Sequence, residues 1–396
     1  MSRIVVTGIG IITSLGASLS ENRAALVKGL SGIGQARFFN SKYTEKLPFG
    51  EIKTATNELA QYLNVTAPGA TRTDILALYA AEQAIADAGL SLKELGLPAT
   101  ALVGASTVGG MCFTDEMYKD ANSSNGKGSP YLQSYSNSAN TTFLQQQYQV
   151  GGIINTFNTA CSSSANAIMY GARLLKNGLA EKVIAGGVDS LSKFTVNGFN
   201  ALMILSDAPC RPFDAGRKGL NLGEGAAFLV LEKEAAVTGK KIYAEVKGYG
   251  NSNDAYHPSS TSETAEGPFL CMQRALQSAE LEASAIDFIN AHGTATENND
   301  ATESVAMLRL FGNPPAFTST KSYTGHTLGA AGAVEAVYSI LNLQNQEIYP
   351  SLNFEAPIVS TKLVPVINYQ QKQIKNVMSN SFGFGGNCTS LIFSKV

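Results

Sequence analysis

The sequence predicts an α/β fold in which two similar halves pack together as layers. Short apolar runs, many of them ending in glycine, alternate with segments that have the periodicity of a helix. This alternation starts again near residue 241, after a Gly-Lys-Lys turn. The 396 residues also exceed one ordinary domain. We therefore assign residues 1–240 to an N-terminal half and residues 241–396 to a C-terminal half, although no obvious sequence repeat relates them.

The N-terminal half is expected to begin with a buried strand at residues 4–6, followed by a turn from Gly8 to Gly16. These glycines lack the G-x-G-x-x-G spacing, so we reject a dinucleotide site there. Residues 31–65 have no regular pattern. The other expected elements are, in order, helices at 21–28 and 74–88, a strand at 101–105, a polar surface loop at 120–130, an extended segment at 152–157, a helix to about residue 177, and strands at 182–185 and 226–231.

The C-terminal half repeats the alternation of strands and helices. Its expected elements are a strand at 243–247, a helix at 265–279, a strand at 287–290, a helix at 300–311, a strand at 316–319, a helix at 328–343, and strands near 362–367 and 390–393.

Charge and cysteine usage exclude several classes of function. The 29 basic and 31 acidic residues nearly balance, which argues against a nucleic-acid or anionic-membrane binder. No run of about 18 apolar residues is present, so we expect no membrane span, and the N-terminus has no signal-peptide pattern. The five cysteines are scattered and form no C-x-x-C pair, which indicates neither a disulfide framework nor a zinc ribbon. A reducing cytoplasm is the expected compartment.

Cys161 is the candidate nucleophile. It lies in Asn-Thr-Ala-Cys-Ser-Ser-Ser, where an extended segment enters a turn of small residues and a helical pattern follows. A thiol at this junction is next to the first helical N–H groups and the positive end of the helix dipole, both of which favour the thiolate. We expect the serines that follow to cap the helix. The alternative is a buried cysteine that packs as a small apolar residue.

Two of the only three histidines lie in matching positions and favour a site over a structural role. His292 ends an apolar strand directly before glycine, and His326 lies between a strand and a helix of small residues. Strand ends are where ligands gather in α/β sheets. Metal binding is the rival use, but no carboxylate or second cysteine has ligand spacing to either histidine, so we predict no metal. His257 is interpreted as architectural.

On these residues and the motifs around them, the chain resembles the elongating β-ketoacyl-(acyl carrier protein) synthases of the thiolase superfamily. The resemblance covers nearly the whole chain and implies the thiolase-like fold, a layered αβαβα sandwich. The matching motifs are Thr-Ala-Cys-Ser-Ser at 159–163, Ala-Gly-Gly-Val-Asp at 185–189, Arg-Pro-Phe-Asp at 211–214, Leu-Gly-Glu-Gly-Ala at 222–226, His-Gly-Thr-Ala-Thr at 292–296, Lys-Ser-x-Thr-Gly-His at 321–326, and Asn-Ser-Phe-Gly-Phe-Gly-Gly at 380–386.

The resemblance implies a decarboxylative Claisen condensation. By this resemblance Cys161 receives the acyl chain as a thioester, and His292 with His326 stabilise the enolate that forms when malonyl on a second carrier loses CO₂. The backbone N–H groups of Cys161 and Phe384 would hold the tetrahedral oxyanion. Phe384 also matches the family's gating phenylalanine.

The other site residues are likewise implied by the family. Lys321 matches the lysine that sets the electrostatics of the histidines, and Glu335 matches the glutamate that supports it. Thr294 and Thr296 match residues that hydrogen-bond the phosphopantetheine arm, although a structural role is equally compatible with the sequence. Val108 and Met111, which match the region that lines the acyl tunnel, complete the expected site. No cofactor is expected beyond the phosphopantetheine carried by acyl carrier protein.

Departures from the family pattern bear on partners. The loop at 206–211 is shorter than in housekeeping fatty-acid enzymes and is closer to ketosynthases of polyketide and aryl-polyene systems. The helix start near residue 72 carries only Arg72, where housekeeping enzymes have a basic cluster for the carrier. Asn387 and Cys388 replace the usual Thr-Asn after the gate glycines. The expected partners are therefore acyl carrier protein and either a second copy of the chain or a chain-length-factor-like subunit.

Two other functions remain as alternatives. A non-catalytic partner subunit would resemble a synthase but lack the cysteine, which is present here. A degradative thiolase or a cysteine hydrolase is the other alternative, and a hydrolase would need open access for water. The second histidine of Thr-Gly-His326 argues against the initiating condensing enzymes and plant-type polyketide synthases, which use Cys-His-Asn.

Overall fold

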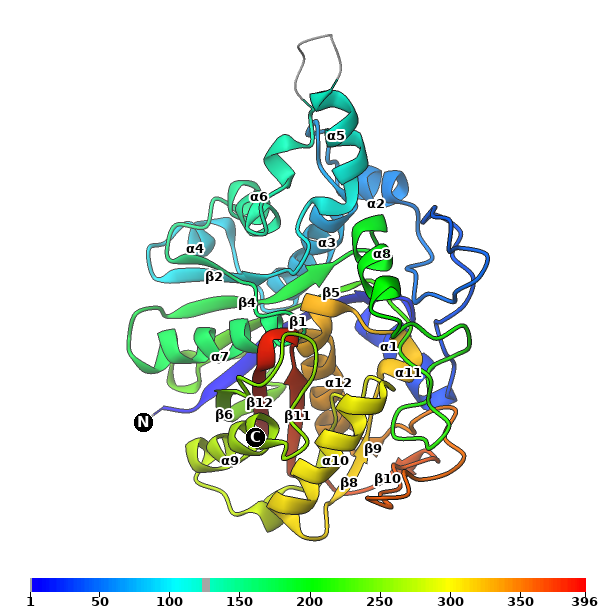
Figure 1. Ribbon diagram of the computed structural model, residues 1–396. Coiled ribbons are helices and arrows are strands. Elements are labelled where there is room, and N and C mark those ends of the chain that lie inside the picture. The colour runs from blue at the N-terminus through cyan, green and yellow to red at the C-terminus, as the bar shows by residue number, and fades with distance from the viewer. Residues whose placement is uncertain (1, 123–128) are drawn as a thin grey trace.

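A single mixed sheet organises the computed structural model, which describes residues 2–122 and 129–396 (Figure 1). Its strand order is β3-β2-β4-β5-β1-β6-β12-β11-β7-β8, and a separate pair is formed by β9 and β10. The strands are β1 (Ile4–Thr13), β2 (Thr100–Ala105), β3 (Ile154–Phe157), β4 (Lys182–Asp189), β5 (Gly225–Lys233), β6 (Ala244–Asn253), β7 (Phe288–Asn290), β8 (Ala316–Thr318), β9 (Glu347–Ile348), β10 (Gln370–Gln371), β11 (Asn376–Phe382) and β12 (Asn387–Ser394).

The helices complete the layers. They are α1 (Leu19–Lys28), α2 (Thr56–Tyr62), α3 (Arg72–Asp87), α4 (Leu92–Leu95), α5 (Thr114–Ala121), α6 (Ala139–Tyr148), α7 (Ser163–Lys176), α8 (Lys193–Ala201), α9 (Glu266–Ala279), α10 (Glu297–Phe311), α11 (Lys321–Thr324) and α12 (Ala331–Asn345). One core cluster joins α3 to the N-terminal strands, a second surrounds α7 and α12, and a third joins α9 and α10 to the C-terminal strands. The layered α/β fold predicted from the sequence is confirmed.

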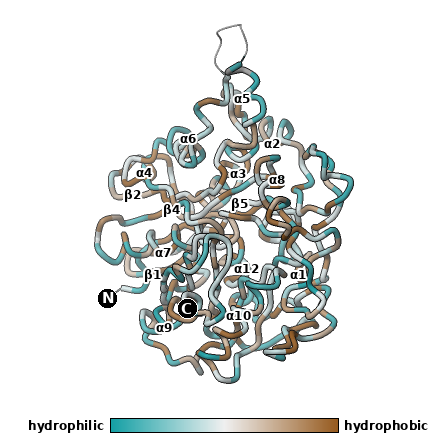
Figure 2. The backbone as a smooth tube through the Cα atoms, in the orientation of Figure 1, coloured by the Kyte–Doolittle hydropathy of each residue, from teal (hydrophilic) through white to brown (hydrophobic). Residues whose placement is uncertain are grey.

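The two halves of the sheet have the same pairing pattern. In the first half, β1–β5 and β5–β4 are antiparallel, while β4–β2 and β2–β3 are parallel. In the second half, β6–β12 and β12–β11 are antiparallel, while β11–β7 and β7–β8 are parallel. A short antiparallel pairing of β1 with β6 joins the halves. The central strands are hydrophobic, as Figure 2 shows for β5, and hydrophilic residues lie at the periphery.

The predicted turn at Gly8–Gly16 is wrong over its first part, because β1 runs through both Gly8 and Gly10 to Thr13. These glycines allow α3 to lie against the strand: a Cβ added at Gly8 or Gly10 would be 2.3 or 1.9 Å from a carbonyl oxygen of α3. Gly248 and Gly250 of β6 lie against α9 in the same way: a Cβ added at either would be 2.5 or 2.1 Å from a carbonyl oxygen of α9. The G-x-G pattern therefore marks close strand–helix packing in both halves.

Three other predictions fail locally. Residues 31–65, expected to be irregular, contain α2, and the strand expected at 362–367 is absent while β10 and β11 follow it. The strand at 182–185 continues through Gly186 and Gly187 to Asp189. The centre of the surface loop predicted at 120–130, residues 123–128, lies outside the described residues. Among the residues that are described, no helix is both long and apolar enough to cross a bilayer.

Candidate active site

A cavity of about 400 Å³ brings the sequence-predicted nucleophile and histidines together. Cys161, His292 and His326 line it and are buried, with exposed fractions of 6%, 1% and 1%. Thr294 and Thr296 line the same cavity, and their hydroxyl groups are 2.8 Å apart. His257, also a lining residue, is exposed at the surface. Residues from four different connections thus meet around one space.

Cys161 is presented on a tight turn between β3 and α7. Ala160, directly before it, has a φ of +51°, a left-handed conformation that is unfavourable for a residue with a Cβ. The prediction that serines cap α7 is wrong, because Ser162 at the N-cap position makes no side-chain capping bond. Its hydroxyl group instead donates to the backbone oxygen of Thr159 at 2.7 Å, and that of Ser163 bonds to Ala160. The serines therefore stabilise the turn itself.

Burial raises the pKa of the Cys161 thiol to about 11. The charge of Lys321 and a hydrogen bond from the backbone N–H of Phe384 lower it, but less than burial raises it, and Glu335 and Asp189 act in the same direction as burial. The expected preference for the thiolate is therefore wrong for the free protein, since desolvation outweighs the favourable groups. The resting nucleophile is a thiol.

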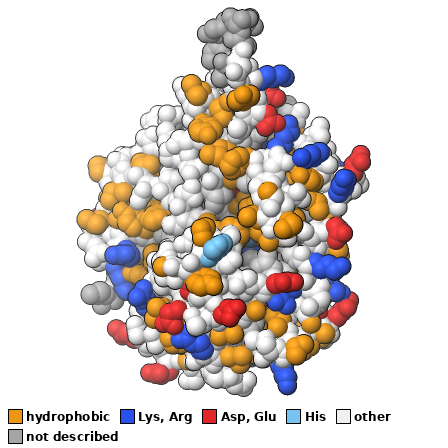
Figure 3. Space-filling view, viewed as in Figure 1, with side chains coloured by type: hydrophobic (Ala, Val, Ile, Leu, Met, Phe, Trp, Pro, Cys, Tyr) orange, Lys and Arg blue, Asp and Glu red, His pale blue; other side chains and the backbone are white. Residues whose placement is uncertain are grey.

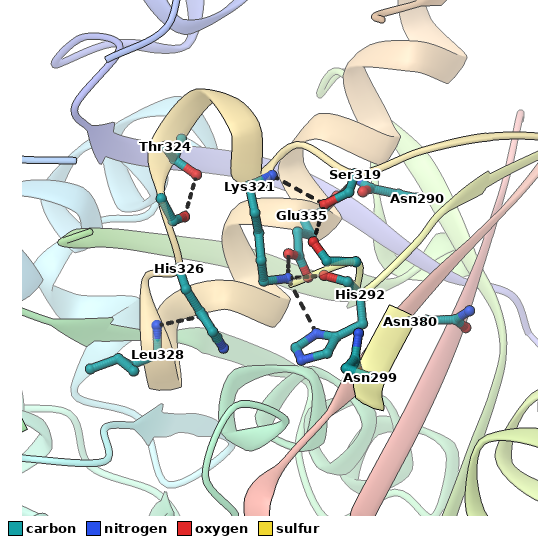
Figure 4. Close-up of polar contacts among 12 residues, drawn as sticks. Asn290, His292, Asn299, Ser319, Lys321, Thr324, His326, Leu328, Glu335 and Asn380 are labelled. Atoms are coloured by element: carbon teal, nitrogen blue, oxygen red, sulfur yellow. Dashed lines mark hydrogen bonds and ion pairs between the residues drawn. The ribbon is translucent and has the colours of Figure 1, made fainter. Parts of the chain in front are cut away.

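The hydrogen bonds of the two histidines place a proton on the Nε2 atom of each ring (Figure 4). The Nδ1 atom of His292 is 3.2 Å from the Lys321 Nζ atom, and the Nδ1 atom of His326 accepts from the backbone N–H of Leu328 at 3.1 Å. An Nδ1 atom that accepts leaves Nε2 as the N–H donor of a neutral imidazole. Burial and the nearby Lys321 charge lower the pKa of both histidines well below the usual value of 6.5, so both rings are neutral donors.

The same tautomers argue against a metal ion. One atom each from Cys161, His292 and His326 lies within 4.8 Å of the others, a spacing that a metal could bridge. A ligating imidazole nitrogen must however be free of its proton, and the Nδ1 partners of both rings keep Nε2 protonated. The cluster is therefore better suited to donate two hydrogen bonds to a negative oxygen than to hold a cation.

Lys321 and Glu335 form a buried pair behind His292. The ammonium group of Lys321, on α11, donates to the Glu335 carboxylate, to the backbone oxygen of His292 at 2.5 Å and toward its ring. Three donors thus meet three acceptors. Burial raises the pKa of Glu335, on α12, to about 7, while Lys321 opposes this shift. The pair fixes the position and the tautomer of His292.

The phenylalanine of the gate motif lies beside the nucleophile. The Phe384 ring stacks on Phe199 of α8 with ring centroids 5.8 Å apart, and both residues line the cavity. A Cβ added at Gly383 would be 2.5 Å from the Thr159 oxygen, so the gate turn touches the nucleophile turn. The side-chain oxygen of Asn387 accepts hydrogen bonds from Ser162, Asn166 and Asn251. Asn387 therefore ties the end of the gate turn to α7.

Three sequence-predicted residues lie elsewhere. Val108 and Met111 pack in a hydrophobic cluster with Leu222 and Leu328, beside the His326 loop, and do not line the part of the cavity formed by described residues. Arg72, the only basic residue at the helix start where housekeeping enzymes have a basic cluster, is directed inward. Its guanidinium group binds the buried Glu224 carboxylate at 2.6 Å, so its charge is used inside the protein.

Two buried carboxylates were missed by the sequence reasoning. Glu303 of α10 accepts from the backbone N–H groups of His292 and Gly293 at 2.9 and 2.8 Å. Asp189, at the end of β4, accepts from the backbone N–H groups of Val108 and Gly329. Burial raises the pKa of both, for Glu303 to about 7. The sequence did contain a signal for each: Asp189 ends a glycine-containing strand motif, and Glu303 lies on the buried face of a helix.

Comparison with known proteins assigns the chain to a family. Residues 1–236 match the model of the β-ketoacyl synthase N-terminal domain, and residues 243–355 match that of the C-terminal domain. A 3-oxoacyl-[acyl-carrier-protein] synthase 2 of Coxiella burnetii is 36% identical over 415 residues, covering 100% of this chain and 99% of the relative.

Solved structures are similar over the full length. The ishigamide ketosynthase/chain length factor matches with a TM-score of 0.94 and 29% identity, covering 100% of this chain and 99% of the other. A ketosynthase bound to the hexaketide, solved in complex with its type II polyketide synthase acyl carrier protein, matches with a TM-score of 0.88 and 25% identity over 100% of both chains.

Proposed function

The chain belongs to the β-ketoacyl synthase family, and from this premise we propose how its site condenses a Cys161-bound acyl chain with malonyl on acyl carrier protein. It is an acyltransferase of the 3-oxoacyl-(acyl carrier protein) synthase type. The observation that carries the proposal is the meeting of one thiol and two neutral imidazole donors within 4.8 Å.

The first step transfers the acyl group to Cys161. The sulfur attacks the thioester carbonyl of the acyl carrier, a new C–S bond forms, and the carrier leaves as its thiol with the proton that Cys161 loses. The high pKa of the thiol means that deprotonation accompanies attack rather than preceding it. The Phe384 N–H, which points at the sulfur, supports an oxyanion hole formed with the Cys161 N–H.

The second step makes the carbon nucleophile. Malonyl on a carrier loses CO₂, and the electron pair of the broken C–C bond becomes an enolate whose oxygen accepts from the Nε2–H groups of His292 and His326. Because both rings are neutral and buried, they donate without giving up a proton to water. Lys321 and Glu335 hold His292 in this tautomer.

The third step joins the two fragments. The enolate carbon attacks the Cys161 thioester, a tetrahedral oxyanion forms, and its collapse breaks the C–S bond. Cys161 leaves as the thiolate and takes up one proton, so that acyl-enzyme, malonyl carrier and a proton yield β-ketoacyl carrier and CO₂. Thr294 and Thr296 line the cavity where the pantetheine arm would enter, and the reaction needs no cofactor other than that arm.

Mass spectrometry of the intact protein tests the assignment. Incubation with acyl carrier is expected to add one acyl group to the wild type and none to Cys161→Ala, and a later addition of malonyl carrier should release β-ketoacyl carrier. Failure of the wild type to become acylated by any of a series of acyl carriers would overturn the proposal.

A heterodimer with a chain-length-factor-like subunit is the second candidate for the active species. It is supported by the similarity to the ishigamide ketosynthase/chain length factor and by the loss of Arg72 to an internal ion pair. Polyketide or aryl-polyene elongation is the proposed pathway class. Full activity of the isolated homodimer would contradict the heterodimer. The free state of all five cysteines supports the cytoplasm as the proposed compartment.

A further inference from the structure

The C-terminal end of α8 places two apolar side chains in solvent at the mouth of the catalytic cavity. Leu202 and Met203 follow the last residue of α8 and line the cavity that contains Cys161. Their exposed fractions are 45% and 88%, so nearly half of Leu202 and most of Met203 are in contact with solvent. Figure 3 shows hydrophobic side chains exposed over this part of the molecular surface. We name Leu202 and Met203 the α8 rim.

The backbone of Met203 makes its exposure more informative. Its φ is +56°, in the left-handed region that glycine and asparagine occupy at helix ends. Other helices among the described residues that end at a positive φ use glycine or a polar side chain there, namely Gly29, Asn64, Gly89, Gln149, Gly178, Glu280, Gly312, Gly325 and Gln346. Met203 therefore combines an unfavourable backbone with an exposed apolar side chain, two costs that folding alone does not explain.

The charges at the mouth leave little for electrostatic docking. Lys218 and Glu297 are the charged side chains that line the cavity among the described residues, and they have opposite signs. Arg72 is held by Glu224 and is not available at the surface. The described lining of the cavity therefore carries no net charge, while the Arg217 guanidinium group beside it donates to the backbone oxygens of Thr296 and Glu297.

We propose that the α8 rim is an apolar docking contact for acyl carrier protein, with Met203 as its central residue. The inference rests on the proposed function, because a carrier must sit on the rim while its arm extends to Cys161. Methionine suits such a contact, since its flexible thioether adapts to different partner surfaces. Because the contact is apolar, carrier-dependent acylation should change little with ionic strength, unlike docking by charged pairs.

Two acyl donors separate docking from chemistry. Met203→Asn and Met203→Gly suit the left-handed backbone and remove the apolar side chain, so the unfolding midpoint should rise or stay unchanged. The rate of Cys161 acylation is measured with an acyl carrier and with the same acyl group on N-acetylcysteamine, which has no protein part. We expect the ratio of these rates to fall about five- to tenfold in both variants, as for an interface anchor. Glu280→Asn, at the left-handed end of α9, is the matched control and should leave both rates unchanged.

The outcomes are distinct. A selective loss with the carrier, together with rates that differ little between low and moderate salt, supports the proposal. If the acylation rate falls equally with both donors, Met203 acts on the cavity itself rather than on carrier docking. If the rate falls with neither donor, Met203 has no role in acylation. Each result overturns the inference. A change in oligomeric state on sedimentation would assign the rim to a subunit contact and also overturn it. If the wild type is acylated by neither donor, the proposed function itself fails.

Discussion

The two halves of the sheet share one scaffold but carry different chemistry at corresponding strand ends. The connection after β3 carries Cys161, and the corresponding connection after β8 carries Lys321 and His326. The connection after β2 carries Val108, whereas that after β7 carries His292. The duplicated strands and helices set where the reacting groups stand, and the residues in the loops decide what each half does.

A buried carboxylate stabilises the loop in each half, but from a different element. Asp189 of β4 accepts from the Val108 loop, and Glu303 of α10 accepts from the His292 loop. The first loop belongs to the hydrophobic cluster beside the site, while the second presents a catalytic imidazole. Similar backbone support thus serves a structural loop on one side and a reactive loop on the other.

The comparison is tested most strongly by removing the nucleophile of the N-terminal half alone. Cys161→Gln should lower condensation by about 10⁴-fold or more, because no acyl-enzyme can form. Decarboxylation of malonyl carrier should persist, since the C-terminal half supplies the donors for the enolate. Release of CO₂ and formation of β-ketoacyl carrier are measured separately. Loss of both activities would contradict a division of labour between the halves.

The reciprocal change removes one donor from the C-terminal half. His292→Asn or His326→Asn should lower decarboxylation by about 10²–10³-fold, the usual effect of losing one oxyanion-hole donor. Acylation of Cys161 should fall much less, because its oxyanion is held by backbone N–H groups. The two steps are followed by CO₂ release and by intact mass. Acylation that falls as far as decarboxylation would show that the histidines serve both steps.

The sequence predicted the site better than it predicted the fold boundaries. Cys161 follows the strand β3 in a turn of small residues, and His292 and His326 each stand next to a glycine, so these local sequence patterns remain recognisable in the structure. The strand that runs through Gly8 and Gly10 was cut short because the partner of a glycine, here a carbonyl oxygen of α3, is distant in sequence. The same G-x-G pattern recurs at Gly248 in the C-terminal half. Its role in close strand–helix packing can be recognised only in the folded structure, where α9 lies against these glycines.

Electrostatics were the least predictable part of the site. The position of Cys161 before a helix favours a thiolate locally, yet tertiary burial reverses this preference. The ion pair of Arg72 could likewise not be predicted from the helix start, because its partner Glu224 comes from the distant β5 connection. Both cases have one cause: a sequence pattern contains local geometry but not the dielectric or the partners that folding brings.

The pH dependence of stability tests the support given to the His292 loop. Glu303 has its pKa raised from 4.5 to about 7, so its contribution is fully present below about pH 4.5 and is lost as pH rises through about 7. The wild type should therefore lose roughly 3 kcal/mol relative to Glu303→Gln between pH 4.5 and 8, at about 1.4 kcal/mol per pKa unit. Urea unfolding at several pH values measures the difference. Parallel curves for the two proteins would show that Glu303 titrates normally.

The smallest expected effect concerns the seam between the halves. Asn387, from the C-terminal half, accepts from Ser162 and Asn166 of the N-terminal half, and its removal in Asn387→Ala leaves these donors without that acceptor. The cost should be about 2 kcal/mol, since both donors keep other acceptors at Thr159. Asn387→Asp retains the accepting oxygen and should cost less, although it adds charge. The comparison is made by urea unfolding together with the rate of Cys161 acylation, which should change only a few-fold in Asn387→Ala. If the two variants are destabilised equally, the oxygen is not what joins the halves, and shape alone accounts for the contact.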